Sequence, residues 1–130
     1  MATYKDTERQ TVEIGGLRFE ITHRTLQDDG GPTIEVYGDV DGESTQVLRF
    51  DCFRKAPHYH MPPSSPEVLK LDPATVGDGL DWSLAQIREH VPEMLATAGF
   101  TELSRAVDRE ALASDWTRVR DAVAATAPVA

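Results

Sequence analysis

Two histidines separated by one residue, His58 and His60, lie in a proline-bounded segment shortly after Asp51. On an extended backbone alternate side chains point the same way, so this pair presents two imidazoles together. Neutral imidazole is a common metal ligand, and imidazole nitrogens combined with a carboxylate suit zinc or iron. Because His23 is predicted near the end of a strand, the expected ligand set for a divalent metal is His58, His60, Asp51 and His23.

A metal held there would activate water, with Asp51 as ligand or base. Asp51, His58, His60 and the neighbouring Arg49 are therefore the candidate catalytic residues of a small hydrolase. A structural interpretation competes with this one. In it the two rings only pack a proline-rich loop onto a sheet and hydrogen-bond its carbonyl groups, because two histidines alone fall short of a zinc-site motif.

Cys52 is the only cysteine of the chain. It alternates with Leu48 and Phe50, so we expect a thiol buried in the core rather than a nucleophile, which needs a lowered pKa and a nearby base. A single cysteine cannot form an internal disulfide, which fits a reducing compartment.

The first half of the chain must supply the strands that position these residues. Alternating apolar and polar side chains predict strands over residues 11–14, 17–24, 33–37 and about 45–53. The pair Gly15-Gly16 predicts a hairpin turn, because both residues can adopt positive φ. The second half predicts the covering helices, after loop-like residues 56–80 with five prolines.

Several residues mark where the helices begin and end. Asp81 is the expected N-cap of a helix that starts near Trp82, and Pro92 is expected to kink or break it. Gly99 is expected to end it, and further helices follow with a break near residues 108–114. The predicted fold is α+β: a four-stranded antiparallel meander followed by two or three C-terminal helices packed on one face. We expect one domain over residues 1–130, frayed at 1–8 and 125–130.

The other face of the sheet is predicted to be open. Arg18, Glu20 and Arg24 are expected to form cross-strand ion pairs with acidic and basic residues of the later strands. A set of larger apolar side chains is expected to interrupt these charges: Tyr37, Val47 and Phe53. A partly apolar sheet face predicts a homodimer or another protein partner.

Composition excludes several classes of function. A formal net charge of −9 opposes general binding to nucleic acid or to an anionic membrane. No apolar run approaches the roughly 18 residues that a membrane span needs, and the first ten residues lack the apolar core of a signal peptide. We therefore expect a cytoplasmic protein.

The segment over about residues 45–98 resembles an uncharacterised family of small bacterial proteins and is distantly similar to TumE-type proteins of toxin–antitoxin pairs. The resemblance is carried by an Arg-aromatic-Asp strand end, a Pro-His-rich loop and a following helix, with these matching positions: Arg49, Asp51, Pro57, His58 and His60. It departs from the TumE pattern in residues 52–55, which are inserted, and in lacking a later histidine cluster. The resemblance implies a small α+β protein that works with a partner.

Three functions follow as expectations. The first is a structural or interaction module that forms a homodimer through its sheet. The second is a small metal-binding protein or hydrolase that uses residues 57–60, and the third is a component of a toxin–antitoxin pair.

Overall fold

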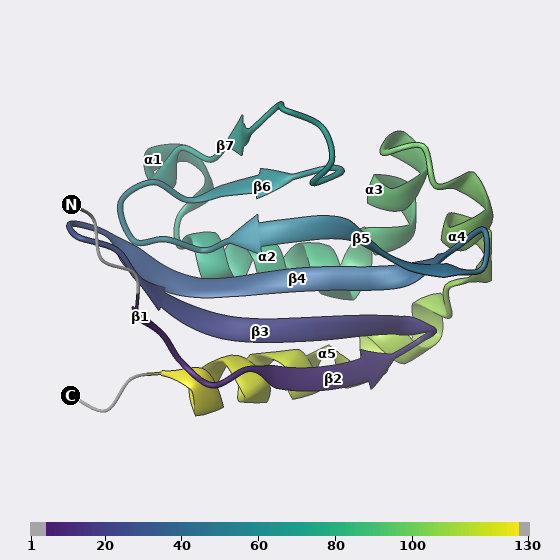
Figure 1. The fold of residues 1–130 in the computed structure, drawn as a ribbon, viewed down its shortest axis with the longest axis horizontal. Helices are drawn as coiled ribbons and strands as arrows, with labels where there is room; N and C mark the ends of the chain where they lie inside the picture. Colours follow the sequence, from purple (N-terminus) through teal and green to yellow (C-terminus); the bar gives the residue numbers. More distant parts are fainter. Residues whose placement is uncertain (1–4, 128–130) are drawn as a thin grey trace.

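A computed structural model describes residues 5–127. Its strands form one antiparallel sheet, and its helices cover one face of that sheet, so that in Figure 1 the sheet faces the viewer with α2 and α5 behind it. The strands are β1 (Lys5–Asp6), β2 (Gln10–Ile14), β3 (Leu17–Thr25), β4 (Gly30–Val40), β5 (Glu43–Asp51), β6 (His58–His60) and β7 (Leu69–Lys70). The helices are α1 (Pro73–Val76), α2 (Gly79–Glu89), α3 (Val91–Thr97), α4 (Thr101–Ala106) and α5 (Arg109–Thr126).

The α+β class and the meander β2–β3–β4–β5 agree with the sequence prediction. The predictions of four strands and of two or three C-terminal helices are wrong, since α2, α3, α4 and α5 follow the sheet within the described residues. The sheet follows the order β1-β3-β4-β5-β6-β7, and β2 also pairs with β3, so the seven segments occupy six positions. Residues 56–80, predicted as loop, supply β6, β7 and α1. Pro57 and Pro62 flank β6 rather than interrupt it, so neither proline removes a hydrogen bond from the ladder.

The core lies between the inner face of the sheet and the helices. It is built on the expected alternation of the strands and on the apolar stripe of α2 and α3, and its largest fully buried side chains include Phe19, Ile21, Ile34, Phe50, Ile87 and Leu95. Burying a side chain of this size contributes roughly 1.5–3 kcal/mol. The α5 helix packs against α2, β2 and β3 and closes the core.

The helix boundaries differ from the prediction at the start and agree at the end. Asp78, three residues before the expected Asp81, is the N-cap of α2 and accepts a hydrogen bond from the backbone N–H of Leu80. The expected break near Pro92 falls at His90, which separates α2 from α3. Gly99 has a φ of +99° and follows α3, and the N–H of Phe100 donates to the carbonyl of Leu95, as in a Schellman motif.

The outer face of β5 also departs from the prediction. The register pairs Val36 with Leu48 but Tyr37 with Gln46, so Val47 is the extra residue of a β-bulge. The bulge turns Val47 into the core, where it is fully buried, instead of onto the open face. Phe53 is buried against the ring of His58. Of the three apolar residues expected to interrupt the open face, Val47 lies in the core, Phe53 is buried and Tyr37 is half-buried.

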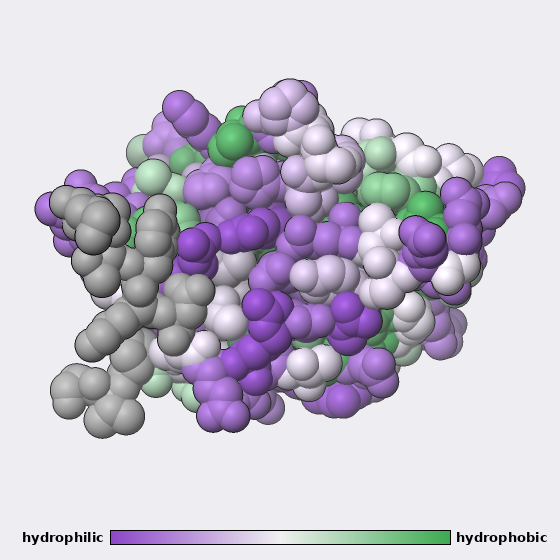
Figure 2. Space-filling model, viewed as in Figure 1, coloured by the Kyte–Doolittle hydropathy of each residue, from purple (hydrophilic) through white to green (hydrophobic). Residues whose placement is uncertain are grey.

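The open face is accordingly polar. Figure 2 shows mainly hydrophilic residues over its strands. Among the described residues, Val68 is the one large hydrophobic side chain that is exposed, and it lies outside the strands. Within residues 5–127 no helix has the length and apolar character needed to cross a membrane. The ends expected to fray, 1–8 and 125–130, lie partly outside the described residues. Their described parts include β1 and the last turn of α5.

Candidate metal centre

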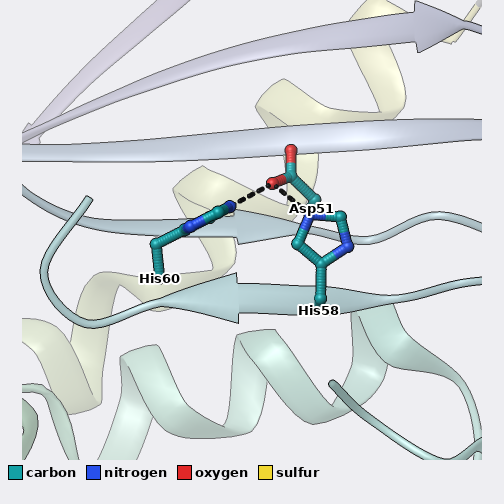
Figure 3. A group of neighbouring side chains, drawn as sticks. All are labelled: Asp51, His58 and His60. Atoms are coloured by element: carbon teal, nitrogen blue, oxygen red, sulfur yellow. Dashed lines mark ion pairs between the residues drawn. The ribbon is translucent and has the colours of Figure 1, made fainter. Parts of the chain in front are cut away.

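The end of β5 and the short strand β6 bring Asp51, His58 and His60 together on the open face. The antiparallel register places His58 opposite Asp51 and His60 opposite Arg49. Since residues directly opposite each other share a face and alternate residues of one strand do too, all four side chains point the same way. Figure 3 shows both imidazole rings directed at the carboxylate between them.

Both histidines approach the same oxygen of Asp51. The Nε2 atom of His58 lies 3.0 Å from Oδ2 of Asp51, and Nε2 of His60 lies 3.2 Å from it. One ligand atom from each of the three residues can be chosen so that all lie within 4.8 Å of one another. The two rings stand nearly perpendicular, with centroids 5.2 Å apart, so they meet the carboxylate from different directions.

The Asp51 carboxylate is buried and ionised. The hydroxyl of Thr33 donates to Oδ1 over 2.9 Å, and Nε of Arg49 lies 3.2 Å from both carboxylate oxygens. Burial raises the pKa of Asp51, but the hydrogen bond from His58, the charge of Arg49 and the hydrogen bond from Thr33 together outweigh it and lower this pKa to about 2. The Asp51 carboxylate therefore keeps its negative charge at neutral pH.

His58 is held in one orientation by its other nitrogen. Nδ1 lies 3.0 Å from the carbonyl oxygen of Ala56, and because a carbonyl only accepts, Nδ1 carries the proton. The ring also packs edge-on against Phe53, with centroids 5.5 Å apart. In the neutral ring, Nε2 then turns a lone pair toward the carboxylate oxygen. Two lone pairs at this distance repel each other, so a proton or a cation must supply positive charge between them.

The hydrogen bond to Asp51 raises the pKa of His58 above its ordinary value, while burial lowers it and the Ala56 carbonyl raises it further. The raised pKa means that the neighbouring carboxylate favours the protonated ring. At low pH the proton on Nε2 faces the carboxylate, and once that proton has left, a bound cation can take its place.

The loop between β5 and β6 is anchored by Asp29, which the sequence did not single out. Its carboxylate accepts hydrogen bonds from the backbone N–H groups of Lys55 and Ala56, at 2.9 and 3.0 Å. Burial raises the pKa of Asp29, and the hydrogen bonds from Lys55, Gly30 and Ala56 reverse this shift and lower it. Because Ala56 supplies the carbonyl that orients His58, Asp29 positions the site without touching it.

His23 is not brought to this group. It follows Phe19 and Ile21 on the helix-covered side of β3, whereas Asp51 faces the open side of β5. Its Nδ1 atom is buried without a hydrogen-bond partner among the described residues, and burial lowers the pKa of this ring. His90, at the end of α2, is exposed and lies 3.7 Å from Glu93.

Cys52 is buried in the core, as predicted. Its Sγ lies 3.4 Å from the hydroxyl of Ser83, and burial raises the pKa of the thiol to about 12. A thiol with so high a pKa is protonated at neutral pH and is a poor nucleophile.

Thr33 is a second supporting residue that no sequence motif marks. It holds Asp51 only because the register pairs it with that residue across β4 and β5, and no local sequence signal marks such a pairing.

The fold and the site thus define a small α+β domain with two imidazoles and one carboxylate on an open sheet face. Comparison with family models identifies the family. The chain belongs to the family described as Domain of unknown function (DUF7700), which it matches over residues 11–124. That range includes all three residues of the cluster. A search of curated proteins and a search of solved structures each gave no match. The expected uncharacterised family is confirmed, while the similarity to TumE-type proteins and the bacterial origin stay predictions.

Proposed function

We propose that this protein binds a divalent transition metal, zinc or iron(II), through Asp51, His58 and His60. One observation carries the proposal: two imidazole Nε2 atoms converge on one carboxylate oxygen while Nδ1 of His58 is tied to a backbone carbonyl. Metal-ligating histidines commonly donate their second ring nitrogen to such a carbonyl, which fixes the tautomer and leaves the first nitrogen free to ligate.

The distances fit a coordination shell. Nitrogen and oxygen ligands lie about 2.0–2.2 Å from zinc, so neighbouring ligands in tetrahedral or octahedral geometry are roughly 3.0–3.5 Å apart. The two nitrogen–oxygen distances in the cluster are 3.0 and 3.2 Å. Mixed imidazole and carboxylate ligands favour zinc or iron over magnesium and calcium, which prefer oxygen ligands alone.

Three protein ligands leave a coordination position open. The side chains of His58 and His60 are 22% and 20% exposed, so solvent reaches the histidine side of the cluster. A metal held by these residues would leave room for water in the open position and would lower the pKa of that water, which is the basis of metal-assisted hydrolysis. The predicted homodimer and the toxin–antitoxin role stay predictions, and the polar open face gives the homodimer no added support.

The test is equilibrium dialysis of the chelator-treated protein against zinc, followed by elemental analysis. The wild type is expected to retain zinc stoichiometrically, and His60→Gln to lose it while unfolding at a similar temperature. His90→Gln is the matched control, because it removes an exposed histidine far from the cluster. Absence of zinc in the wild type, or equal loss in both variants, contradicts the proposal. The first of these results would leave a protonated His58 as the charge that balances Asp51.

A further inference from the structure

We infer that the metal centre takes an anionic ligand, a carboxylate or a phosphate group, between Arg49 and Lys70. This inference rests on the proposed metal site and adds the chemical class of what binds there. It starts from two cations that lie beside the cluster on the same face of the sheet and have unused hydrogen-bonding capacity.

Arg49 uses only part of its guanidinium. Its Nε contacts Asp51, whereas its two terminal nitrogens make no hydrogen bond within the described residues. The side chain is 27% exposed, so these nitrogens are near solvent. The parallel N–H groups of a guanidinium match the oxygens of a carboxylate or phosphate, which accept two hydrogen bonds at once.

The carboxylate across the strand from Arg49 is already occupied. Glu35 pairs with Arg49 in the register of β4 and β5, yet its oxygens accept hydrogen bonds from three other side chains: Arg9, Tyr37 and Gln46. Arg49 turns instead toward Asp51. No carboxylate within the described residues therefore competes for the terminal nitrogens of Arg49.

Lys70 flanks the other side of the cluster. It is opposite His58 in the register of β6 and β7, so its side chain leaves the same face of the sheet. It is exposed and forms no ion pair in the part of the chain that the structure describes. Arg49 stands beside His60 and Lys70 beside His58, which places one cation at each histidine.

The local charge opposes that of the whole molecule. The chain carries a net charge of −9, but the cluster combines one carboxylate with Arg49, Lys70 and, in the proposed state, a divalent ion. This excess of positive charge attracts an anion to the open coordination position. There one anionic oxygen would ligate the metal while the others accept hydrogen bonds from Arg49 or Lys70.

The experiment uses the cobalt(II)-loaded protein, whose visible spectrum reports a change of ligand at the metal. Benzoate and phenyl phosphate are titrated separately, so the two sources of the anionic group are distinguished. At least one of them is expected to change the spectrum saturably. Arg49→Lys keeps the charge but loses the paired N–H groups, and we expect binding weakened by at least about tenfold, the effect of losing a hydrogen bond to a charged group. Arg18→Lys, on the same face, is the matched control.

A second variant separates anion binding from metal binding. Lys70→Gln touches none of the three ligands, so it should weaken the anion by about threefold, as a screened surface charge does, and leave cobalt affinity unchanged. Lys55→Gln is its control. If wild-type protein binds no metal, the proposed function fails. If it binds metal but neither anion, or if Lys70→Gln and Arg49→Lys both bind the anion as the wild type does, this inference alone is overturned.

Discussion

Two clusters of charge lie side by side on the open sheet face, and they are balanced in different ways. Around Glu20 and Glu35, the donors are side chains that always carry their protons. Arg9 reaches both carboxylates, Arg18 donates to Glu20 over 2.6 Å, and Tyr37 donates to Glu35 over 2.9 Å. Arg18 also lies over the ring of Tyr37, 4.5 Å from its centroid. Both carboxylates of this network are therefore paired with guanidinium groups.

The Asp51 cluster lacks that balance. Arg49 pairs with Asp51, but Nε2 of His58 also lies 3.0 Å from the ionised carboxylate while its Nδ1 faces the carbonyl oxygen of Ala56. Ion pairing accounts for the first cluster, whereas in the second a neutral His58 would leave a lone pair facing the carboxylate, which is the place of the proposed cation.

The largest difference should be in metal affinity. Asp51→Asn keeps the shape of the side chain and its contact with Thr33, but it removes the charged ligand. We expect zinc affinity to fall by more than about a hundredfold, since even outer-shell partners of a metal are worth about 10–100-fold. Glu20→Gln, in the balanced network, should change it less than about twofold. Isothermal titration calorimetry of both variants measures this contrast, and similar losses in the two would remove the distinction.

Metal should also stabilise the fold. With free zinc at a hundred times its Kd, binding adds about 2.7 kcal/mol to the free energy of unfolding, which raises the Tm of a domain of this size by roughly 10 °C. A chelator should reverse the shift. Thermal unfolding of His60→Gln, followed by circular dichroism, should be insensitive to zinc. A wild-type Tm that ignores both zinc and chelator would argue against a site formed in the folded state.

The metal-free protein should lose stability in acid through Asp51. Its pKa is about 2 when folded against an ordinary value of 3.8, so its contribution is complete above about 3.8 and is lost as the pH falls toward 2. The loss is about 2 kcal/mol. The raised pKa of His58 acts in the opposite sense, because its contribution is complete below 6.5 and is lost as the pH rises through the raised value. Urea unfolding across this range should show a smaller acid loss in Asp51→Asn than in the wild type. Some loss remains in the variant because the pKa values of Glu20, Asp29 and Glu93 are also lowered.

The smallest effect on stability is expected in the network around Glu20 and Glu35. Arg9→Ala removes two ion pairs of a side chain that is 48% exposed, and such surface pairs contribute at most about 1 kcal/mol. We expect a small decrease in the free energy of unfolding that shrinks further in high salt, with zinc binding unchanged. A decrease of several kcal/mol in urea unfolding would mean that this network, and not only the core, determines stability.

The sequence predicts what depends on local pattern. Alternation placed Phe50 and Cys52 in the core and Asp51 outside it, and Gly99 ends its helix as expected because a positive φ favours glycine there. The same alternation argues against His23 as a ligand of this group: a side chain that follows Ile21 on the inner face cannot meet one on the outer face.

What the sequence could not give depends on register and tertiary pairing. The bulge that buries Val47 depends on the register between β4 and β5. The prolines on either side of β6 predict a loop, although residues 58–60 form a strand that pairs with β5. The roles of Thr33, Asp29 and Ala56 arise from segments that come together only in the folded chain. The grouping of Asp51, His58 and His60 was therefore predictable from their spacing, whereas the residues that hold them in place were not.

The most direct test of the metal centre is long-range ¹⁵N–¹H NMR of the four histidine rings during titration of metal-free protein with zinc. We expect the Nε2 resonances of His58 and His60 to shift together, Nδ1 of His58 to stay protonated toward Ala56, and His23 and His90 not to respond. Rings that ignore zinc, or a response of His90 equal to that of the pair, would contradict the proposal.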